Sequence, residues 1–548
     1  MPVKSRSAIL RLIQPDLQEG VLGRAGNMLD DVAAYLDSVD VRNLDGAFPA
    51  FTFDPAAASS YLPPPVDHPA LEPESGTAPA VDVQDLPWTP PTDIARLVRA
   101  GELTAAEVAG LYARRIDDWQ PEVNAFIEVT LNEAAAPLSG PLVGVPVGLT
   151  DLIDVAGLPT TAGSAMMRGR IAGADADCWS ALSNSGAVLA GKLNVQEFAA
   201  GTTGENARFG WTRNPWDTTR MTGGACGGAG AAVAAGMVSA ALGPDPGGSI
   251  RVPAAHCGVV ALKPTYGAIS RRGVLPLTWT LDALGVMAQR VRGVAGIADQ
   301  LLVPHTPRGR RGRHGSCESA ALAGELAAGL DLTFGIPTSW LDMGLDPEVR
   351  DAFEKALKHL MDLGGKVREV DVPYAGDILR MHRAIAFSEA SASHEPFLLH
   401  QADEYGANIR DREEAGRAML AGDYLKASRI RAVLCRDFSE VWRDVDLILT
   451  PTVPVPAAPI GTESVTTSSR GPEPTHTVYT RYLAPFSSLG LPSLSVPCGA
   501  TTGGLPIGMQ LAGPPHAEAL LFYAAGAYEA TTTWHTRHPV LPPRRKAG

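Results

Sequence analysis

Residues Met221 to Gly230 read MTGGACGGAG, and residues Gly243 to Arg251 read GPDPGGSIR. Paired glycines let the backbone adopt positive φ and approach a ligand closely. The small apolar residues between them, from Ala231 to Leu242, predict a buried helix. Two glycine-rich turns at the ends of one buried helix form a cradle whose amides can point at an anion or a carbonyl oxygen. Either pair alone would be an ordinary turn, but the two together predict a ligand site.

The composition describes a globular chain and excludes several classes of partner. The chain has 548 residues, of which 45% are hydrophobic and 19% charged, a length that a large α/β fold reaches with one main domain. Its net charge of -13 argues against nucleic acid or an anionic membrane as a partner. We expect no signal peptide and no membrane span. The six cysteines form no CxxC pair, which argues against a zinc site or a disulfide framework and favours the cytoplasm.

Strand-like and helix-like segments alternate along most of the chain. Short apolar segments predict strands, and longer periodic segments predict helices, so the pattern favours an α/β sheet with helices on both faces. Residues 141–151 predict a short buried strand that ends at a polar turn, although Gly144 and Pro146 argue against a regular central strand around Val145. The expected strands are 187–192, 446–451, 494–497 and 507–511, and the expected helices are 347–363, 378–397 and 424–441.

The N-terminal part has a different character. Residues Arg24 to Val41 carry apolar side chains at helical spacing, which predicts an amphipathic helix that must pack on another surface. The proline-rich run from Pro55 to Pro91 predicts an extended tether. Thr104 and Glu107 then have the spacing of a capping box at the start of a helix.

Several motifs together resemble the amidase signature family over about residues 93–541. They are GVPVGLTDLIDVAG (144–157), GKLNVQEFA (191–199), RNPWD (213–217), GGSIRVPA (247–254), LKPTYG (262–267) and GLPIGMQ (504–510), beside the two glycine turns. The resemblance implies an α/β fold with a central twisted mixed β-sheet covered by helices on both faces. It divides the chain into a helical segment (1–55) similar to the small subunit of some amidotransferases, a tether (56–92) and an amidase signature domain (93–548) with a helical insertion near 340–445.

The resemblance also implies a catalytic triad, of which this chain keeps one member. Family members cleave amides with a lysine, a serine in a cis peptide and a serine nucleophile, and the nucleophile falls on Ser249. The lysine falls on Thr150, whose hydroxyl is too weak a base near neutral pH, and the middle serine falls on Ala225, which has no proton to relay. Pro246 lacks an N–H, so one oxyanion donor is also missing. These losses predict that hydrolysis by the family's route is absent.

The remaining site residues are two glycine pairs and one cysteine. Gly223, Gly224, Gly247 and Gly248 are the expected substrate-binding residues. Cys226 has two open interpretations: a thiolate whose pKa is lowered at a helix N-terminus, or an inert thiol in the core. We expect Arg251 to pair with a carboxylate such as Asp245.

Two functions follow from these observations. The first is an enzyme, related to amidases and hydrolases, that acts on a small amide, acid or acyl metabolite by a non-standard mechanism with Ser249 or Cys226. The alternative is an inactive pseudo-amidase that binds a ligand or a partner protein. Neither function requires a metal or another cofactor. A homodimer is an open possibility for the assembly.

Overall fold

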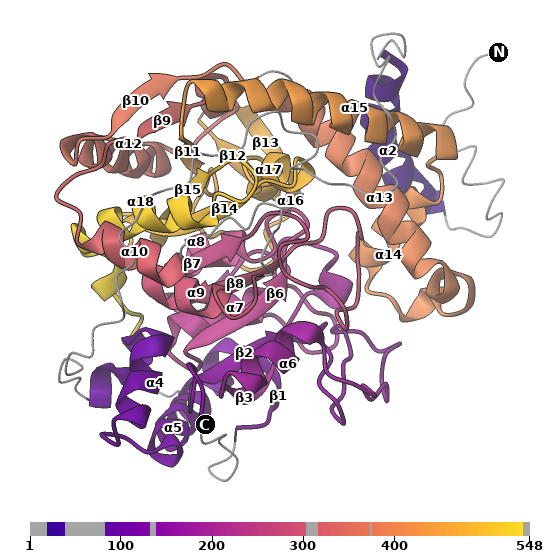
Figure 1. Cartoon of the computed structure of the whole chain (residues 1–548). Coiled ribbons are helices and arrows are strands. Elements are labelled where there is room, and N and C mark those ends of the chain that lie inside the picture. Colours follow the sequence, from indigo (N-terminus) through magenta and orange to yellow (C-terminus); the bar gives the residue numbers. More distant parts are fainter. Residues whose placement is uncertain are drawn as a thin grey trace, which may run out of the picture.

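The centre of the fold is an eleven-stranded mixed sheet (Figure 1). The computed structural model describes residues 19–38, 83–131, 139–302, 316–372, 375–468 and 470–540. The strand order is β1-β3-β2-β6-β8-β7-β14-β15-β11-β9-β10. The strands are β1 Phe126–Val129, β2 Pro146–Thr150, β3 Val188–Leu193, β6 Ala240–Pro244, β7 Val260–Lys263, β8 Leu284–Ala288, β9 Thr333–Ile336, β10 Lys366–Glu369, β11 Leu447–Pro451, β14 Ser493–Ala500 and β15 Pro506–Ala512. The predicted mixed sheet is confirmed, because β2 is parallel to β3 and β6 whereas β6, β8, β7, β14 and β15 are antiparallel in turn.

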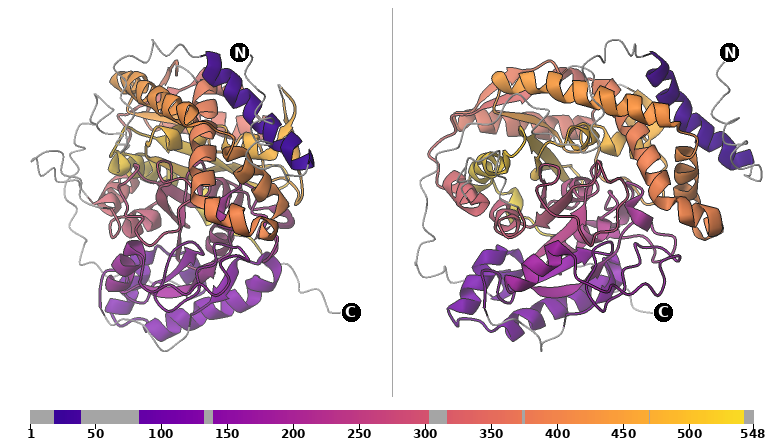
Figure 2. Two further views of the ribbon diagram at one scale, coloured as in Figure 1. Left: turned by 90° about the vertical axis from the view of Figure 1, so that its right-hand side faces the viewer. Right: turned by 45° about the vertical axis from the view of Figure 1, so that its right-hand side comes forward.

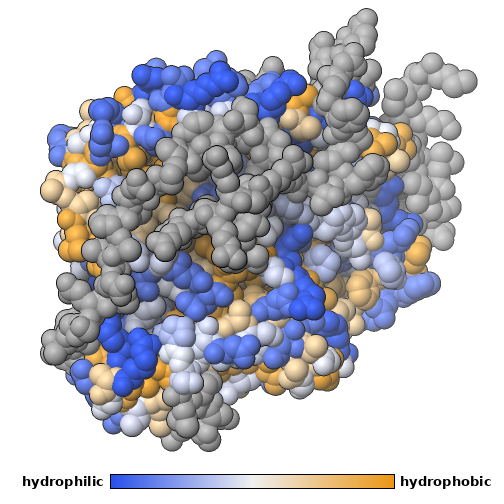
Figure 3. Space-filling view, viewed as in Figure 1, coloured by the Kyte–Doolittle hydropathy of each residue, from blue (hydrophilic) through white to orange (hydrophobic). Residues whose placement is uncertain are grey.

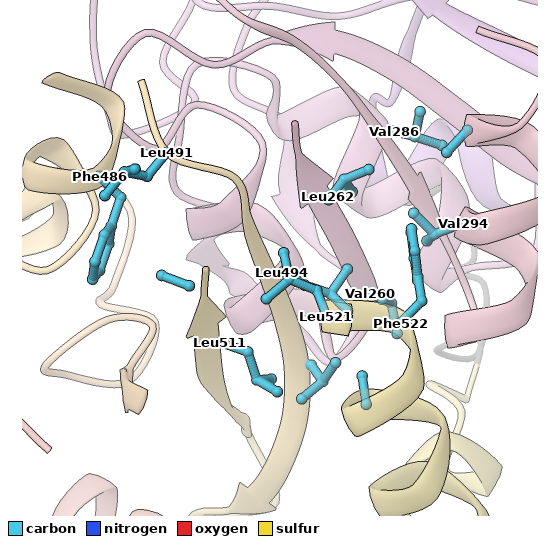
Figure 4. Packing of buried hydrophobic residues seen from close by; sticks show 14 of the residues in the cluster. Val260, Leu262, Val286, Val294, Phe486, Leu491, Leu494, Leu511, Leu521 and Phe522 are labelled. Carbon is cyan, nitrogen blue, oxygen red and sulfur yellow. The ribbon is translucent and has the colours of Figure 1, made fainter. Parts of the chain in front are cut away.

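Alternate residues of the central strands face two different apolar clusters. On β6, Ala240 and Leu242 belong to one cluster and Ala241 to the other, and β7 and β8 repeat the pattern. Helices α9 Val291–Ala298, α12 Pro347–Asp362 and α18 Glu518–Ala530 cover the first face, with α10 Cys317–Glu325 packed on α18. Figure 4 shows Val294 of α9 and Phe522 of α18 among the side chains of this cluster. Helices α5 Ala105–Val123 and α7 Gly227–Ala234 supply the second face, so both faces are covered as predicted.

The segment from Ala231 to Leu242 corrects the prediction of one buried helix. Helix α7 ends at Ala234, Gly236 follows with a φ of +65°, and β6 begins at Ala240. The small apolar residues suit a strand equally well, because β6 pairs with β2 and β8 in the middle of the sheet. Length and hydrophobicity alone do not separate a buried strand from a buried helix.

The short buried strand predicted within 141–151 is β2, but the expectation that Gly144 and Pro146 prevent a regular central strand there is wrong. It lies between β3 and β6, and all five of its residues are buried. Pro146 is tolerated because it is the first residue of the strand. Val147 and Leu149 face the first cluster, so Gly148 and Thr150 face α7.

The other elements match the predicted segments or connect them. The predicted helices 347–363, 378–397 and 424–441 are α12, α13 Ala375–His400 and α15 Ala421–Ser439, and the capping box of Thr104 and Glu107 is present at α5. The connecting helices are α6 Asp177–Asn184, α8 Arg251–Cys257, α11 Thr338–Leu341, α14 Ala407–Gly416, α16 Thr475–Thr480 and α17 Ala484–Ser488, with 3₁₀ turns η3 Glu197–Ala199, η4 Ala402–Glu404, η5 Glu440–Arg443 and η6 Trp534–Thr536. Two hairpins complete the fold, β4 Arg213–Asn214 with β5 Asp217–Met221 and β12 Ser464–Thr467 with β13 Arg470–Pro474.

The predicted N-terminal amphipathic helix is α2, Glu19–Ser38. It packs against α13, α14 and α15 (Figure 2) and buries Leu29, Val32 and Leu36. Asp31 forms ion pairs with Arg380 and Arg383 of α13.

Most of the predicted tether, residues 56–82, lies outside the described residues. Its last part folds into the 3₁₀ helix η2 Val83–Trp88 and the start of α4 Pro91–Arg99.

The surface in Figure 3 is hydrophilic along its upper edge, where α15 runs in Figure 1. In the described ranges, no helix combines the length and apolar character needed to cross a bilayer.

Candidate active site

The two glycine-rich turns meet in space, although β6 separates them in the sequence. The Cys226 N–H donates to the Ser249 carbonyl oxygen at 3.2 Å. Gly223 and Gly224 have φ of +70° and +66°, and Gly248 has a φ of +125°, a region that strongly favours glycine. A Cβ on Gly224 would lie 2.5 Å from the Ser249 carbonyl oxygen. The glycines are therefore needed for this close approach of the two turns.

A buried ion pair holds the second turn in place. The Arg251 guanidinium donates from Nε and Nη2 to the two carboxylate oxygens of Asp245, each at 2.9 Å. The Asp245 carboxylate also accepts a hydrogen bond from the Gly248 N–H. Burial alone would raise the pKa of Asp245, but Arg251 holds that pKa below its usual value. The predicted pairing of Arg251 with Asp245 is confirmed.

The remaining donors of Arg251 reach three other elements. Nη1 donates to Gln510 Oε1 at 2.8 Å and to Ser493 Oγ at 3.0 Å, and Nη2 donates to Ser487 Oγ at 2.8 Å. Gln510 and Ser493 lie on β15 and β14, and Ser487 lies on α17. The turn of Ser249 is thus tied to the sheet and to α17 by one fully buried side chain.

Thr150 is the last residue of β2, the strand against which α7 packs. Its hydroxyl donates to the Leu242 carbonyl oxygen at 2.7 Å, and its side chain is fully buried. A Cβ on Gly243 would lie 2.7 Å from Thr150 Oγ1 and 2.9 Å from Cys226 Sγ. Thr150, Cys226 and Gly243 therefore fill the space beside the Ser249 turn without leaving a basic group there.

Cys226 lies at the N-cap of α7 but is fully enclosed. Its thiol donates to the Pro244 carbonyl oxygen at 3.5 Å. Burial raises the pKa of Cys226 well above the usual value, and Thr150 offsets this only in part. Of the two interpretations from the sequence, these observations favour the core thiol.

Ala225 and Ser249 complete the set of predicted positions. Ala225 packs in an apolar cluster with Leu152, Phe198 and Leu277. Ser249 is 5% exposed, and among the described residues no partner hydrogen-bonds to its hydroxyl. Gly247 is the more accessible residue of the turn. The structure thus brings Ser249, Ala225, Thr150 and Cys226 together, and in the described part of the chain neither Thr150 nor Ala225 offers the Ser249 hydroxyl a base.

Two lysines near the site are buried and have polar partners. Lys192 Nζ lies 2.9 Å from Asp151 Oδ1 and donates to Thr160 Oγ1 at 3.1 Å. Lys263 Nζ donates to the Pro264 carbonyl oxygen at 2.7 Å, and burial beside Arg251 lowers the pKa of Lys263 to about 7.

Sequence reasoning missed His382, which lies on α13. A Cβ on Gly247 would be 3.2 Å from His382 Nε2. No motif surrounds this histidine, so only the packing of α13 against the turn reveals it.

A pocket of about 240 Å³ lies at the end of β6. Its lining includes Pro244, Leu275, Trp279 and Asp282. Burial raises the pKa of Asp282 to about 6, although its carboxylate accepts hydrogen bonds from Leu277 N and Thr278 N. Pro244 is the last residue of β6, and none of residues 245–249 belongs to this lining. Within the described ranges, no group of three or more His, Cys, Asp or Glu side chains could hold a metal ion.

Comparison with known proteins gives one consistent result. The family model described as Amidase matches residues 107–522. The chain is 37% identical over 489 residues to the A subunit of glutamyl-tRNA(Gln) amidotransferase from Chloroflexus aggregans, covering 81% of this chain and 96% of that protein. It resembles the solved structure of the corresponding Thermotoga maritima protein with a TM-score of 0.67 and 32% identity, covering 80% and 95% of the two chains. It also resembles 6-aminohexanoate cyclic dimer hydrolase in complex with substrate, with a TM-score of 0.75 and 27% identity, covering 84% and 100%.

Proposed function

This chain belongs to the amidase family, and we propose that it acts on a small amide, acid or acyl compound at the turn of Ser249, by a route other than the family's lysine–serine–serine relay. One observation carries the proposal. The turn of Ser249 is held by the Asp245–Arg251 pair, while Thr150 and Ala225 occupy the base and relay positions. A scaffold for ligand binding is retained, and the proton acceptor for the usual chemistry is missing.

The oxyanion donors of the turn support the same proposal. Pro246 has no N–H, and the Gly248 N–H is already bonded to Asp245. The backbone N–H groups of Gly247 and Ser249 therefore remain as the donors of this turn for the carbonyl oxygen of a substrate. Losing one oxyanion donor costs about 10²–10³-fold in rate, and losing a general base costs about 10²–10⁴-fold.

The second candidate function is a pseudo-amidase that binds a ligand or a partner protein without chemistry. The burial of Cys226 and its raised pKa favour it, because they remove the alternative nucleophile. The relatives include subunits of an amidotransferase, which supports a protein partner for this chain. We also propose that residues 1–55 take the place of a small helical subunit, since α2 packs on α13, α14 and α15. The alternative to an assembly with a different protein is a homodimer, which light scattering on the purified chain would detect by its doubled mass.

Labelling with a fluorophosphonate tests the route. Intact-mass measurement of the full chain should show no adduct at Ser249, and a Ser249→Ala variant serves as the control. Stoichiometric labelling of Ser249 would show that the usual nucleophile is active. In parallel, turnover of a panel of primary amides and acyl esters separates the two candidate functions, because only the enzyme releases product, and Ser249→Ala should lower that release.

A further inference from the structure

The pocket at the end of β6 combines apolar walls with two charged side chains. Its volume is about 240 Å³, and Val274, Leu275 and Leu284 are among its apolar wall residues. The charged residues of the lining are Arg271 and Asp282. A concave, mostly apolar space with a few convergent polar groups is typical of a small-molecule site, and this volume suits a ligand smaller than a drug molecule.

Trp279 is the exposed aromatic residue of this lining. It is 43% exposed, although Thr278 and Thr280 on either side of it are buried. The Thr278 N–H donates to Asp282 Oδ2 at 3.0 Å, and the Thr280 N–H donates to Glu389 Oε2 at 2.9 Å. Because the backbone is anchored on both sides of Trp279, the indole offers a flat apolar surface that a ligand does not have to order.

Arg271 supplies a fixed cation to the same pocket. Its Nη1 donates to the Trp279 carbonyl oxygen at 2.6 Å, and its Nη2 donates to the Tyr266 hydroxyl at 2.9 Å. The guanidinium carbon lies 4.8 Å from the centre of the Tyr266 ring. A guanidinium has five N–H donors, so three remain after these two bonds. Among the described residues, those three have no hydrogen-bond partner and Arg271 forms no ion pair with a carboxylate.

The carboxylate of Asp282 is engaged with its own turn instead. Its Oδ2 accepts from the N–H groups of Leu277 and Thr278, and its Oδ1 accepts from the Thr278 hydroxyl at 2.7 Å. The residue is only 4% exposed, and burial raises its pKa to about 6, while Arg271 acts in the opposite direction. An anion in the pocket therefore meets the donors of Arg271, and the nearby Asp282 charge opposes it only while Asp282 is ionised.

We propose that this pocket is a binding site for a small organic carboxylate with a flat apolar body, of the aryl carboxylate class. The carboxylate oxygens accept from the remaining N–H donors of Arg271, and the apolar body lies against Trp279 and Leu284. An uncharged analogue keeps the apolar contact but loses the charge-assisted hydrogen bonds. Because none of residues 245–249 lines the pocket, the inference goes beyond the proposed function and does not depend on it.

The test compares benzoate with its uncharged analogue benzyl alcohol by titration calorimetry on the full chain. We expect the wild type to bind benzoate about tenfold or more tightly than benzyl alcohol. Arg271→Met should reduce this ratio to about one, whereas Trp279→Ala should weaken the binding of both probes. Arg272→Met is the matched control, because the neighbouring Arg272 pairs with Asp177 and lies outside the lining. Equal losses in the Arg271 and Arg272 variants would overturn the inference.

The pH dependence of the wild type gives an outcome that needs no variant. Between about pH 7.5 and 5.5 Asp282 gains a proton while benzoate stays ionised, so a negative charge near the bound anion is removed. The affinity for benzoate should therefore rise as pH falls, and the affinity for benzyl alcohol should stay constant. A benzoate affinity that falls or stays level would overturn the inference. So would the absence of benzoate binding at millimolar concentration, which would leave the proposed function at Ser249 standing.

Discussion

Asp245 and Arg251 form a bidentate ion pair directly beneath the turn that carries Ser249, with both N–O distances at 2.9 Å. Both side chains are fully buried. Two charges without solvent are stable only when each is paired and hydrogen-bonded, and here the carboxylate also holds the Gly248 N–H. The geometry of the candidate site therefore depends on this pair.

Arg251→Met should destabilise the fold strongly, because it leaves the Asp245 carboxylate buried and unpaired. We expect a loss of about 3–5 kcal/mol in the free energy of unfolding, measured by urea denaturation. Lys366→Met is the matched control, since Lys366 and Asp331 form an exposed pair, and its urea midpoint should not change. Similar midpoints for both variants would contradict the role of the buried pair.

Cys226 should resist alkylation in the native protein. Iodoacetamide at neutral pH should modify it no faster than the other five cysteines, all of which are buried, and urea should expose all six together. Cys226→Ala should leave any turnover unchanged. Selective modification of Cys226 in the folded chain would instead support it as a nucleophile.

The combined substitutions Thr150→Lys and Ala225→Ser should activate Ser249. Burial at position 150 would favour the neutral amine that a base requires, and the serine introduced at position 225 would supply the relay hydroxyl. Fluorophosphonate labelling should become at least about 100-fold faster. Adding Ser249→Ala should abolish it. A folded double variant without labelling would show that Pro246 or the closed packing, rather than the missing base, blocks the chemistry.

Deletion of residues 1–55 should lower the melting temperature or the solubility. Leu29, Val32 and Leu36 of α2 are buried on α13, α14 and α15, and their removal leaves apolar surface in water. Asp31→Asn is the control, because it breaks only the partly exposed ion pairs with Arg380 and Arg383 and should change the melting temperature little. A truncated chain with an unchanged melting temperature and solubility would show that α2 does not stabilise the rest of the chain.

His256 lies on α8 with its side chain buried, and it should weaken the fold at acidic pH. Burial lowers the pKa of His256 from 6.5 to about 4, so between these two values the unfolded state binds the extra proton and stability falls as pH falls. The difference in unfolding free energy between wild type and His256→Gln should shrink on acidification by up to about 1.4 kcal/mol per pH unit. A difference that grows towards low pH would contradict the neutral, buried ring.

Several features follow from the sequence because they depend on local chemistry. Glycines at 223, 224 and 248 indicate turns whatever surrounds them, since their φ values are open mainly to glycine. The capping box at Thr104 and the periodic helices after Pro347 were predictable for the same reason. The sequence alone likewise shows that Thr150 and Ala225 replace the lysine and the middle serine of the family's triad.

Other features were decided only by tertiary structure. The run from Ala231 to Leu242 divides into α7 and β6 because β2 and β8 offer strand partners, and Pro146 is accepted because it opens a central strand. The pKa of Cys226 rises because burial outweighs the helix terminus. His382 reaches Gly247 only through the packing of α13 against the turn. Residue type fixes what a side chain can do, whereas burial and its neighbours fix which of those abilities remains.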